Sequence, residues 1–214
     1  MFNTQGEPNV TTNHIADELG ISPGNLYYHF RNKDDIIEQL FAGYEQRMDT
    51  ALLAPSGRLP GLEDVWLQLH LVFECIWDYR FLYRDLVDIL SRNRRLRMRF
   101  ARILKRADEQ AHTVMRGLVQ AGVMRASADE VDAASTNILV IATFWMNYAS
   151  ARGDKDERAS IRDGIVQVMM LISPFAKKHH VSHNVYDHTS ITRFVEARFD
   201  LPAITGRDAN AEAP

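Results

Sequence analysis

Residues 11–30, TTNHIADELGISPGNLYYHF, decide how the beginning of the chain folds. The first half carries an apolar stripe at helical spacing, made of Ile15, Ala16 and Leu19. Either of the two threonines before this stripe could cap the first turn, and Gly20 would end the helix. Ser22 can cap a second helix, over residues 23–30, whose first position suits the proline there because that N–H has no partner within a helix. The stretch therefore predicts two short helices joined by a tight turn.

One face of the second helix is apolar and is expected to be buried. Leu26 and Phe30 are four residues apart and therefore share a face of the helix. They are predicted to pack against the apolar residues of the preceding helix and turn, Ile15, Leu19 and Ile21. This arrangement suits a helix-turn-helix, whose second helix enters the major groove of DNA, although generic helical hairpins share the pattern.

The other face of the second helix offers small or hydrogen-bonding groups. Gly24 lets the backbone approach base edges, and the amide of Asn25 can pair with adenine. Neighbouring residues of a helix lie about 100° apart, so at least one of Tyr27 and Tyr28 must leave the core. Their hydroxyl groups, and the ring N–H of His29, could then reach DNA phosphates. Ordinary core packing is the alternative for the two tyrosines.

The wording of this segment resembles the TetR family of transcriptional repressors. The likeness rests on Leu19-Gly20-Ile21-Ser22, on Gly24-Asn25-Leu26-Tyr27-Tyr28-His29-Phe30 and on Lys33. It is strong over residues 2–50, whereas residues 62–172 resemble the family only in layout. The resemblance implies that phosphates are contacted by Thr12, Ser22, Tyr27, Tyr28, His29 and Lys33. It implies that bases are contacted by Pro23, Gly24 and Asn25.

The resemblance also sets an expectation for the start of the chain. In the family a further helix precedes the helix-turn-helix, and here only its tail, near residues 2–5, comes before Gly6. Residues 1–53 are therefore expected to be a DNA-binding domain that lacks most of its first helix. We hypothesise that the natural start lies upstream of Met1.

Charge is distributed unevenly along the chain. The net charge of −3 excludes a protein that coats nucleic acid through bulk positive charge. Residues 1–50 hold three basic and eight acidic side chains, so any DNA contact there depends on placement. Residues 92–106 hold eight basic side chains and no acidic one. A second nucleic-acid site is one interpretation of this basic stripe; a solvated helix face whose aliphatic stems cover apolar neighbours is the favoured one.

The rest of the chain divides at breaker residues. Residues 54–61 are expected to be a linker because they contain Pro55, Gly57, Pro60 and Gly61. Residues 62–172 show helical stripes and no β-alternation, with helices expected over about 62–77, 79–90, 94–121, 127–151 and 156–172. We therefore predict an all-α fold in which the helix-turn-helix domain precedes a helical domain for effector binding and dimerisation. The single cysteine, Cys75, stands among apolar residues and is predicted to be buried in a cytoplasmic protein that lacks a membrane span.

The helical domain is rich in aromatic and thioether side chains, which makes an apolar ligand cavity plausible. Its candidate lining residues are Trp66, Phe73, Trp77, Met115, Asn137, Phe144 and Asn147. A closed core is nearly as good an interpretation, because aromatic stripes at helical spacing usually pack. The polar members, together with Thr143, could orient a ligand, or equally cap a helix or line an interface.

Two helices near the end of this domain are candidates for self-association. Residues 131–151 and 161–172 resemble, by position, the helices through which TetR-family chains pair as a four-helix dimer. Twofold symmetry would place two recognition helices about one DNA turn, or a multiple of it, apart, so the expected partner is a palindromic double-stranded operator. The effector, a small apolar molecule, would act by favouring a conformation that misfits the operator.

Residues 173–214 continue beyond the last expected helix. Their wording resembles the C-terminal end of phosphoesterases of the phospholipase C and acid phosphatase type, at Tyr186-Asp187-His188-Thr189-Ser190, Arg193-Phe194, Arg198-Phe199 and Leu201-Pro202. The residues that would hold the nucleophile and metal in that family are absent, so we expect neither catalysis nor a cofactor, and a poorly ordered tail left by gene fusion. The tail histidines, His179, His180, His183 and His188, lack a carboxylate frame and are not interpreted as a metal site.

Together these features predict a dimeric, ligand-responsive transcriptional repressor and no enzyme. Two alternatives stay open. One is a fusion product with a phosphoesterase remnant and impaired DNA binding. The other is a helical dimer whose truncated N-terminal domain no longer binds DNA.

Overall fold

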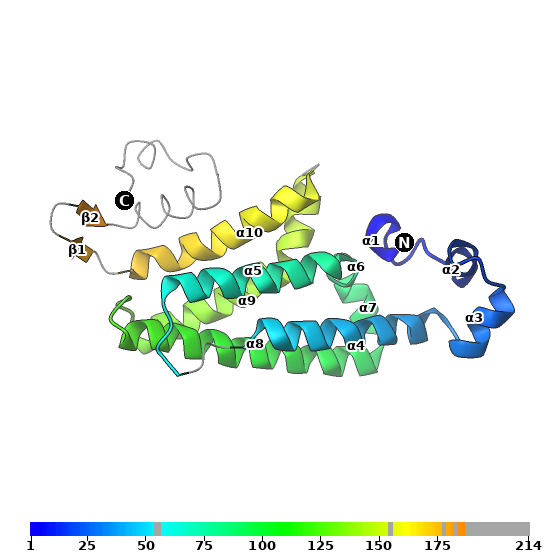
Figure 1. Ribbon diagram of the computed structural model, residues 1–214, viewed down its shortest axis with the longest axis horizontal. Coiled ribbons are helices and arrows are strands. Elements are labelled where there is room, and N and C mark those ends of the chain that lie inside the picture. Colours follow the sequence, from blue (N-terminus) through cyan, green and yellow to red (C-terminus); the bar gives the residue numbers. More distant parts are fainter. Residues whose placement is uncertain (54–56, 154–155, 177–178, 182–183, 187–214) are drawn as a thin grey trace.

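The computed structural model describes residues 1–53, 57–153, 156–176, 179–181 and 184–186, and this part of the chain is almost entirely helical (Figure 1). Its helices are α1 (Phe2–Gln5), α2 (Thr12–Glu18), α3 (Pro23–His29), α4 (Lys33–Ala51), α5 (Leu62–Asp78), α6 (Arg80–Arg84), α7 (Leu86–Arg92), α8 (Arg94–Gln120), α9 (Ala128–Arg152) and α10 (Glu157–Ile172). A 3-10 turn, η1 (Ser173–Phe175), and two short antiparallel strands, β1 (His179–Val181) and β2 (Asn184–Tyr186), follow. The predicted all-α class is confirmed. No helix in the described ranges is both long and apolar enough to cross a bilayer.

The predicted pair of short helices is present as α2 and α3, and we call residues 11–30 the reader. Of the two candidate threonines, Thr11 is the cap of α2, and its hydroxyl accepts the backbone N–H of His14 at 3.2 Å. Gly20 takes a φ of 65°, which lets the chain turn sharply where a side chain would be strained. Ser22 caps α3 by accepting the N–H of Asn25 at 3.2 Å.

The inward packing of the reader differs from the prediction at one residue. Ala16 and Leu26 are buried as the shared face of α2 and α3, but Leu19 is 62% exposed. Leu19 is the residue at which α2 ends, and Ala16, not Leu19, takes the inward position. Ile15, Ile21 and Phe30 are partly buried at the edge of the core.

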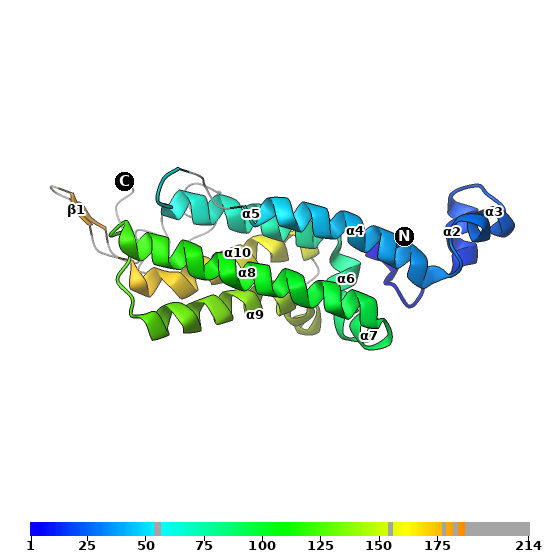
Figure 2. The same cartoon turned by 90° about the horizontal axis from the view of Figure 1, so that it is seen from below.

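Helix α4 carries the chain from the reader into the body of the molecule. The reader lies at one end of the elongated molecule, and α4 extends from it alongside α5 and α8 (Figures 1 and 2). Asn32 caps α4, and Asp34 and Asp35 lie at the positive end of its dipole. One continuous helix therefore connects the reader to the part of the molecule formed by α5 to α10, which we call the body.

The single helix expected over residues 79–90 is instead two helices, α6 and α7. They break at Asp85, whose carboxylate accepts the backbone N–H of Glu7 at 3.1 Å. Aspartate is a poor residue inside a helix, and here a partner distant in the sequence uses its side chain. The long-range hydrogen bond explains why the local pattern gave the wrong boundary.

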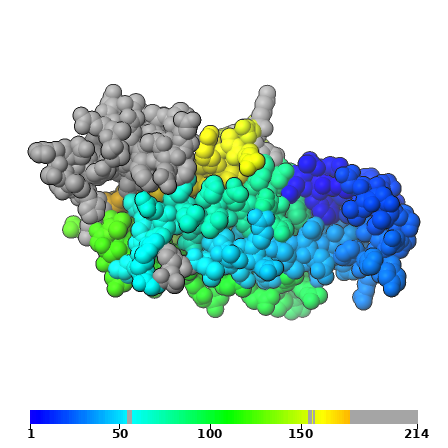
Figure 3. Space-filling view, viewed as in Figure 1, coloured from blue at the N-terminus to red at the C-terminus, as the bar shows by residue number. Residues whose placement is uncertain are grey.

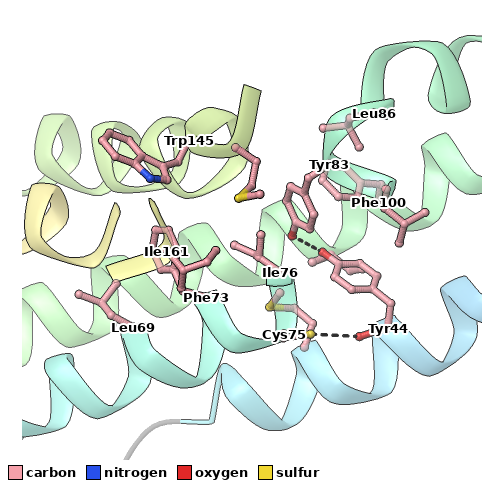
Figure 4. Packing of buried hydrophobic residues seen from close by; sticks show 14 of the residues in the cluster. Tyr44, Leu69, Phe73, Cys75, Ile76, Tyr83, Leu86, Phe100, Trp145 and Ile161 are labelled. Atoms are coloured by element: carbon pink, nitrogen blue, oxygen red, sulfur yellow. Dashed lines mark hydrogen bonds between the residues drawn. The ribbon is translucent and has the colours of Figure 1, made fainter. Parts of the chain in front are cut away.

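The core of the body lies between α5, α8, α9 and α10 (Figure 4). Phe73 is fully buried beside Trp145, whose indole N–H donates to the backbone carbonyl of Ser160 on α10. Cys75 is buried, as predicted. Gly164 permits the close approach of α10, because a Cβ there would lie 2.5 Å from the ring of Phe73 and 2.7 Å from that of Trp145.

We expect the substitution Gly164→Ala to destabilise the body by about 1–3 kcal/mol, because two rigid rings would have to move. This loss opposes the gain of about 1 kcal/mol that alanine normally brings to a helix. Chemical denaturation would measure the difference. The exposed neighbour on the same helix gives the control, Gln167→Ala, which should stay within about 0.5 kcal/mol of the parent. Equal stability of Gly164→Ala and the parent would contradict this packing.

Candidate DNA-binding surface and ligand cavity

The outward face of α3 gathers most of the residues expected to contact DNA. Pro23, Gly24 and Asn25 are exposed in its first turn, and Tyr28 is 85% exposed near its end. The ring of Tyr28 meets His29 edge to face, with ring centres 5.1 Å apart. This face lies at the tip of the molecule, in the blue end of Figure 3. A short helix anchored by Leu26 thus presents hydrogen-bonding groups to solvent.

A hydrogen bond between two hydroxyl groups orients Tyr27, the other tyrosine of α3. The side-chain oxygens of Thr12 and Tyr27 are 2.8 Å apart and form a hydrogen bond between α2 and α3. Tyr27 is nevertheless 49% exposed, so both tyrosines leave the core. Ser22 uses its oxygen as an acceptor in the cap, which leaves its O–H free to donate.

Lys33 faces away from this surface. Its ammonium group lies 2.9 Å from the carboxylate of Glu7 and donates to the Glu7 carbonyl at 3.0 Å. The side chain of Glu7 is 1% exposed and also pairs with Arg92 of α7 at 2.5 Å. Eight of the nine residues predicted to contact DNA therefore belong to the reader. The ninth, Lys33, lies outside it and is paired within the protein.

Burial and charge act in opposite directions on the Glu7 carboxyl group. Burial raises its pKa, but the hydrogen-bonding groups and positive charges of Arg92 and Lys33 together lower the pKa below 4.5. Glu7 is therefore ionised at neutral pH. A buried charge of this kind is tolerated only when paired, so the ion pair links the reader side of the chain to α7.

Helix α1 adds a second link between the N-terminal segment and the body. Phe2 is buried and stacks on Phe81 of α6, with ring centres 5.3 Å apart. Asn3 donates to the carbonyl of Asp78 at 2.7 Å and accepts the N–H of Phe81 at 3.1 Å. Arg84 of α6 donates to the Asn3 carbonyl at 2.8 Å. The start of the chain is thus attached to the end of α5 and to α6.

Three of the eight basic side chains in residues 92–106 form close ion pairs with acidic side chains of α4. Arg95 lies 3.2 Å from Glu38, Arg99 lies 2.8 Å from Glu45, and Arg106 pairs with Asp49. The guanidinium group of Arg99 also stands over the ring of Phe41. These contacts account for part of the acidity of residues 1–50 and part of the basicity of the stripe, because the paired residues lie on two sides of one helix interface. They do not favour a second nucleic-acid site.

One cation that the sequence reasoning did not assign is Arg31. It is exposed directly after α3 and makes no ion pair within the described residues, whereas Lys33 and Arg47 pair with Glu7 and Asp78. The sequence alone shows that Arg31 follows the residues of α3. It does not show that Lys33 is already paired with Glu7.

A cavity of about 100 Å³ lies in the body between α4, α5, α8, α9 and α10. Its lining is mainly hydrocarbon, and Tyr44 and Met48 bring α4 into the wall. An engineered cavity of about 150 Å³ in another protein binds benzene, so a space of this order suits a small ligand. This space favours the interpretation of the helical domain as one with an apolar cavity over that of a fully closed core.

The structure places most of the predicted lining residues elsewhere. Met115 lines the cavity, but Trp66, Phe73, Trp77, Asn137, Phe144 and Asn147 do not. Phe73 is packed against Gly164, and Trp77 stacks on the guanidinium group of Arg80 with a separation of 4.1 Å. Asn137 and Phe144 are exposed, while Asn147 donates to the Arg84 carbonyl at 3.1 Å.

The polar side chains in the cavity wall are ones the prediction left out, except for Thr143. Gln68 of α5 and Gln110 of α8 line the cavity, as do Tyr44 and Tyr83, whose hydroxyl oxygens are 2.6 Å apart (Figure 4). Burial, which is complete for both tyrosines, raises their pKa values well above 10, so both stay neutral.

Helix α9 presents an apolar stripe to solvent. Val140, Phe144 and Tyr148 are spaced four residues apart and are 52%, 47% and 55% exposed. Three large side chains in one row on a helix form a surface suited to another protein surface. They lie within residues 131–151, one of the two segments predicted for self-association.

Two family models match this chain. One, described as bacterial regulatory proteins of the tetR family, matches residues 1–40, and one described as a bacterial transcriptional repressor matches residues 43–183. The chain belongs to the TetR family. A TetR-family transcriptional regulator from Marinobacter aquaeolei VT8 has a solved structure that is 35% identical in sequence, with a TM-score of 0.80. That match covers 94% of this chain and 93% of the other.

Other similar proteins match a shorter segment or the fold alone. The transcriptional repressor KstR2 of Mycolicibacterium smegmatis is 39% identical over 70 residues, a match that covers 29% of this chain and 34% of the relative's length. The chain thus aligns with about a third of that curated relative. A regulator from Haloarcula marismortui shares the fold with a TM-score of 0.61 at 15% identity, covering 82% of this chain and 92% of its own.

The family match also bears on the expected gene fusion at residue 173. It runs to residue 183, and the Marinobacter structure covers too much of the chain to end at residue 172. Within the described residues, Ser173 is buried, and the carbonyl of Phe175 accepts the N–H of Arg125 at 2.8 Å. The first residues of the segment therefore belong to the TetR domain, and a fusion is not supported. Residues 187–214, which include His188 and most of the segment that resembles a phosphoesterase, lie outside the described residues.

We expect Glu7→Gln to lower the free energy of unfolding by about 1–3 kcal/mol at pH 7, because Lys33 and Arg92 lose their shared counter-ion. The pKa of the Glu7 carboxyl group is lowered in the folded chain, so its contribution is complete above the ordinary value of 4.5. The contribution is lost as the pH falls through the folded value, and the difference between the two proteins should shrink accordingly.

Denaturation at a series of pH values would measure this effect. Glu18→Gln, at an exposed position of α2, is the matched control and should show neither the loss nor its pH dependence. A difference between Glu7→Gln and the parent that stays constant from pH 7 to pH 3 would contradict the ion-pair explanation.

Proposed function

We propose that this protein is a dimeric transcriptional repressor that binds a palindromic operator through α3 and releases it when a ligand occupies the body cavity. The observation that carries the proposal is the exposed, hydrogen-bonding face of α3 at the tip of the molecule. We assign Gly24 and Asn25 to base edges, and Ser22, Tyr28 and His29 to phosphates. Arg31 adds a cation that this surface otherwise lacks.

The α9 stripe supports the dimer. Burying Val140, Phe144 and Tyr148 against a second copy would cover the largest exposed apolar row on that helix. A twofold axis near α9 and α10 places one reader on each side of the pair, as a palindromic operator requires. Repression is the sign of regulation suggested by the name of the Mycolicibacterium relative.

Helix α4 supports communication between ligand and reader. The same helix starts directly after the reader and brings Tyr44 and Met48 into the cavity wall. A ligand that binds best when this wall is displaced would favour a different position of α4, and with it a different spacing of the two readers. No catalytic step is part of this function.

We expect Tyr28→Ala to weaken binding to DNA by up to about tenfold, because one phosphate contact is removed. The DNA probe is the sequence enriched by this protein from a random pool. Because Tyr28 is 85% exposed, the unfolding midpoint of the Tyr28→Ala variant should equal that of the parent protein. Tyr28→Phe separates the hydroxyl group from the ring, and Gln120→Ala, at the exposed far end of α8, is the control. Unchanged affinity of Tyr28→Ala, or failure to enrich any sequence, would reject DNA binding through this face.

We expect Phe144→Lys to convert the dimer to a monomer, because a charge would be buried in the proposed interface. Analytical ultracentrifugation at micromolar concentration measures the mass. Met98→Lys replaces a hydrophobic residue of similar exposure on α8 and should leave the dimer intact. A parent protein that sediments as a monomer, or a Phe144→Lys variant that stays dimeric, would argue against α9 as the interface.

A further inference from the structure

The cavity wall contains two amide side chains whose hydrogen-bonding capacity is unused. The amide nitrogens of Gln68 and Gln110 are shielded from solvent and have no hydrogen-bond partner among the described residues. They come from α5 and α8 and line the same space. A buried N–H without an acceptor weakens a fold, so two such groups in one cavity indicate that an acceptor occupies it.

The charge of the cavity wall restricts the ligand further. None of the described residues that line it is lysine, arginine, histidine, aspartate or glutamate. The hydroxyl groups of its two tyrosines form a hydrogen bond with each other, and both stay protonated because burial raises their pKa values. A carboxylate or an ammonium ion would lose its hydration here and gain no counter-ion.

We propose that the cavity binds an uncharged, mainly hydrocarbon molecule that carries a carbonyl oxygen, and that Gln68 and Gln110 donate their amide N–H groups to that oxygen or to two such oxygens. The hydrocarbon part lies against the aliphatic wall formed by residues such as Leu69, Val72 and Ile103. This inference names the chemistry of the effector and rests on the proposed function for its biological meaning. Its binding test does not require DNA.

A bound water molecule is the competing occupant of the polar part of the cavity. Water needs two to four polar partners, which the two amides and the Thr143 hydroxyl could provide together. If water satisfies these groups, a ligand carbonyl that displaces it gains little. The comparison of a ligand with and without the carbonyl distinguishes the two occupants.

The experiment uses the purified full chain and four probes of one ring each, measured by calorimetry at pH 7. Acetophenone and ethylbenzene share the ring and a two-carbon side chain, but only acetophenone carries a carbonyl oxygen. Benzoate and benzylammonium add a negative and a positive charge. We expect acetophenone to bind about tenfold more tightly than ethylbenzene. We expect each charged probe to bind at least about a hundredfold more weakly than acetophenone.

Two variants assign the effect to the amides. Gln68→Met and Gln110→Met keep the length of the side chain and remove its donor, so each should reduce the preference for acetophenone over ethylbenzene. The affinity for ethylbenzene should stay the same or increase. Gln120→Met makes the same change at the exposed end of α8 and should leave all four affinities unchanged.

Each outcome decides the inference. Equal binding of acetophenone and ethylbenzene, tight binding of a charged probe, no binding of any probe, or a preference unchanged in both cavity variants would overturn it. DNA binding by the same preparation is measured separately against the enriched sequence. Loss of DNA binding with an intact preference for acetophenone would reject the proposed repressor and leave the ligand chemistry standing.

Discussion

The position of the reader depends on one buried carboxylate. Glu7 precedes the reader and lies with 1% of its side chain exposed between Lys33, at the start of α4, and Arg92, at the end of α7. A carboxylate in that environment depends on both cations, because water scarcely reaches it and each lost partner removes a counter-ion. The same segment sends its backbone N–H to Asp85, where α6 and α7 meet. Charge pairing and this hydrogen bond thus join three parts of the chain.

The local signals in the sequence predicted the local structure well. Caps at Thr11, Ser22 and Ser127, and the turn at Gly20, form within four residues, so the sequence contains both partners. Lys33 shows the limit of this reasoning. The motif places it as a DNA contact, but its partner is 26 positions away, and only the folded chain shows that its charge is already paired. The break at Asp85 was missed for the same reason, since its partner is 78 positions away.

The cavity was harder to predict than the reader, because side-chain chemistry alone does not separate a core from a pocket. Phe73 is as apolar as any lining residue, yet the absence of a side chain at Gly164 lets α10 close over it. Gln68 and Gln110 lie on helices whose neighbouring polar residues face water, and helical periodicity gave no reason to separate them from that surface. Only the packing of five helices leaves these two amides facing enclosed space, where a polar group is costly and therefore informative.

The cavity wall includes side chains from α4 and from α6, the two helices to which the segments on either side of the reader are attached. Tyr44 belongs to α4, and its hydroxyl group meets that of Tyr83 from α6, the helix to which Phe2 and Asn3 are attached. The ion pairs of Arg95 with Glu38 and of Arg106 with Asp49 are largely exposed and contribute little each, whereas the pair of Arg99 and Glu45 is better shielded. A ligand that separates Tyr44 from Tyr83 would therefore move α4 relative to α6. Glu7 contacts both of the parts that would move. Its carboxylate pairs with Lys33 of α4 and with Arg92 of α7, and its backbone N–H donates to Asp85. The reader can change its angle only if this carboxylate keeps both cations or exchanges one of them for water.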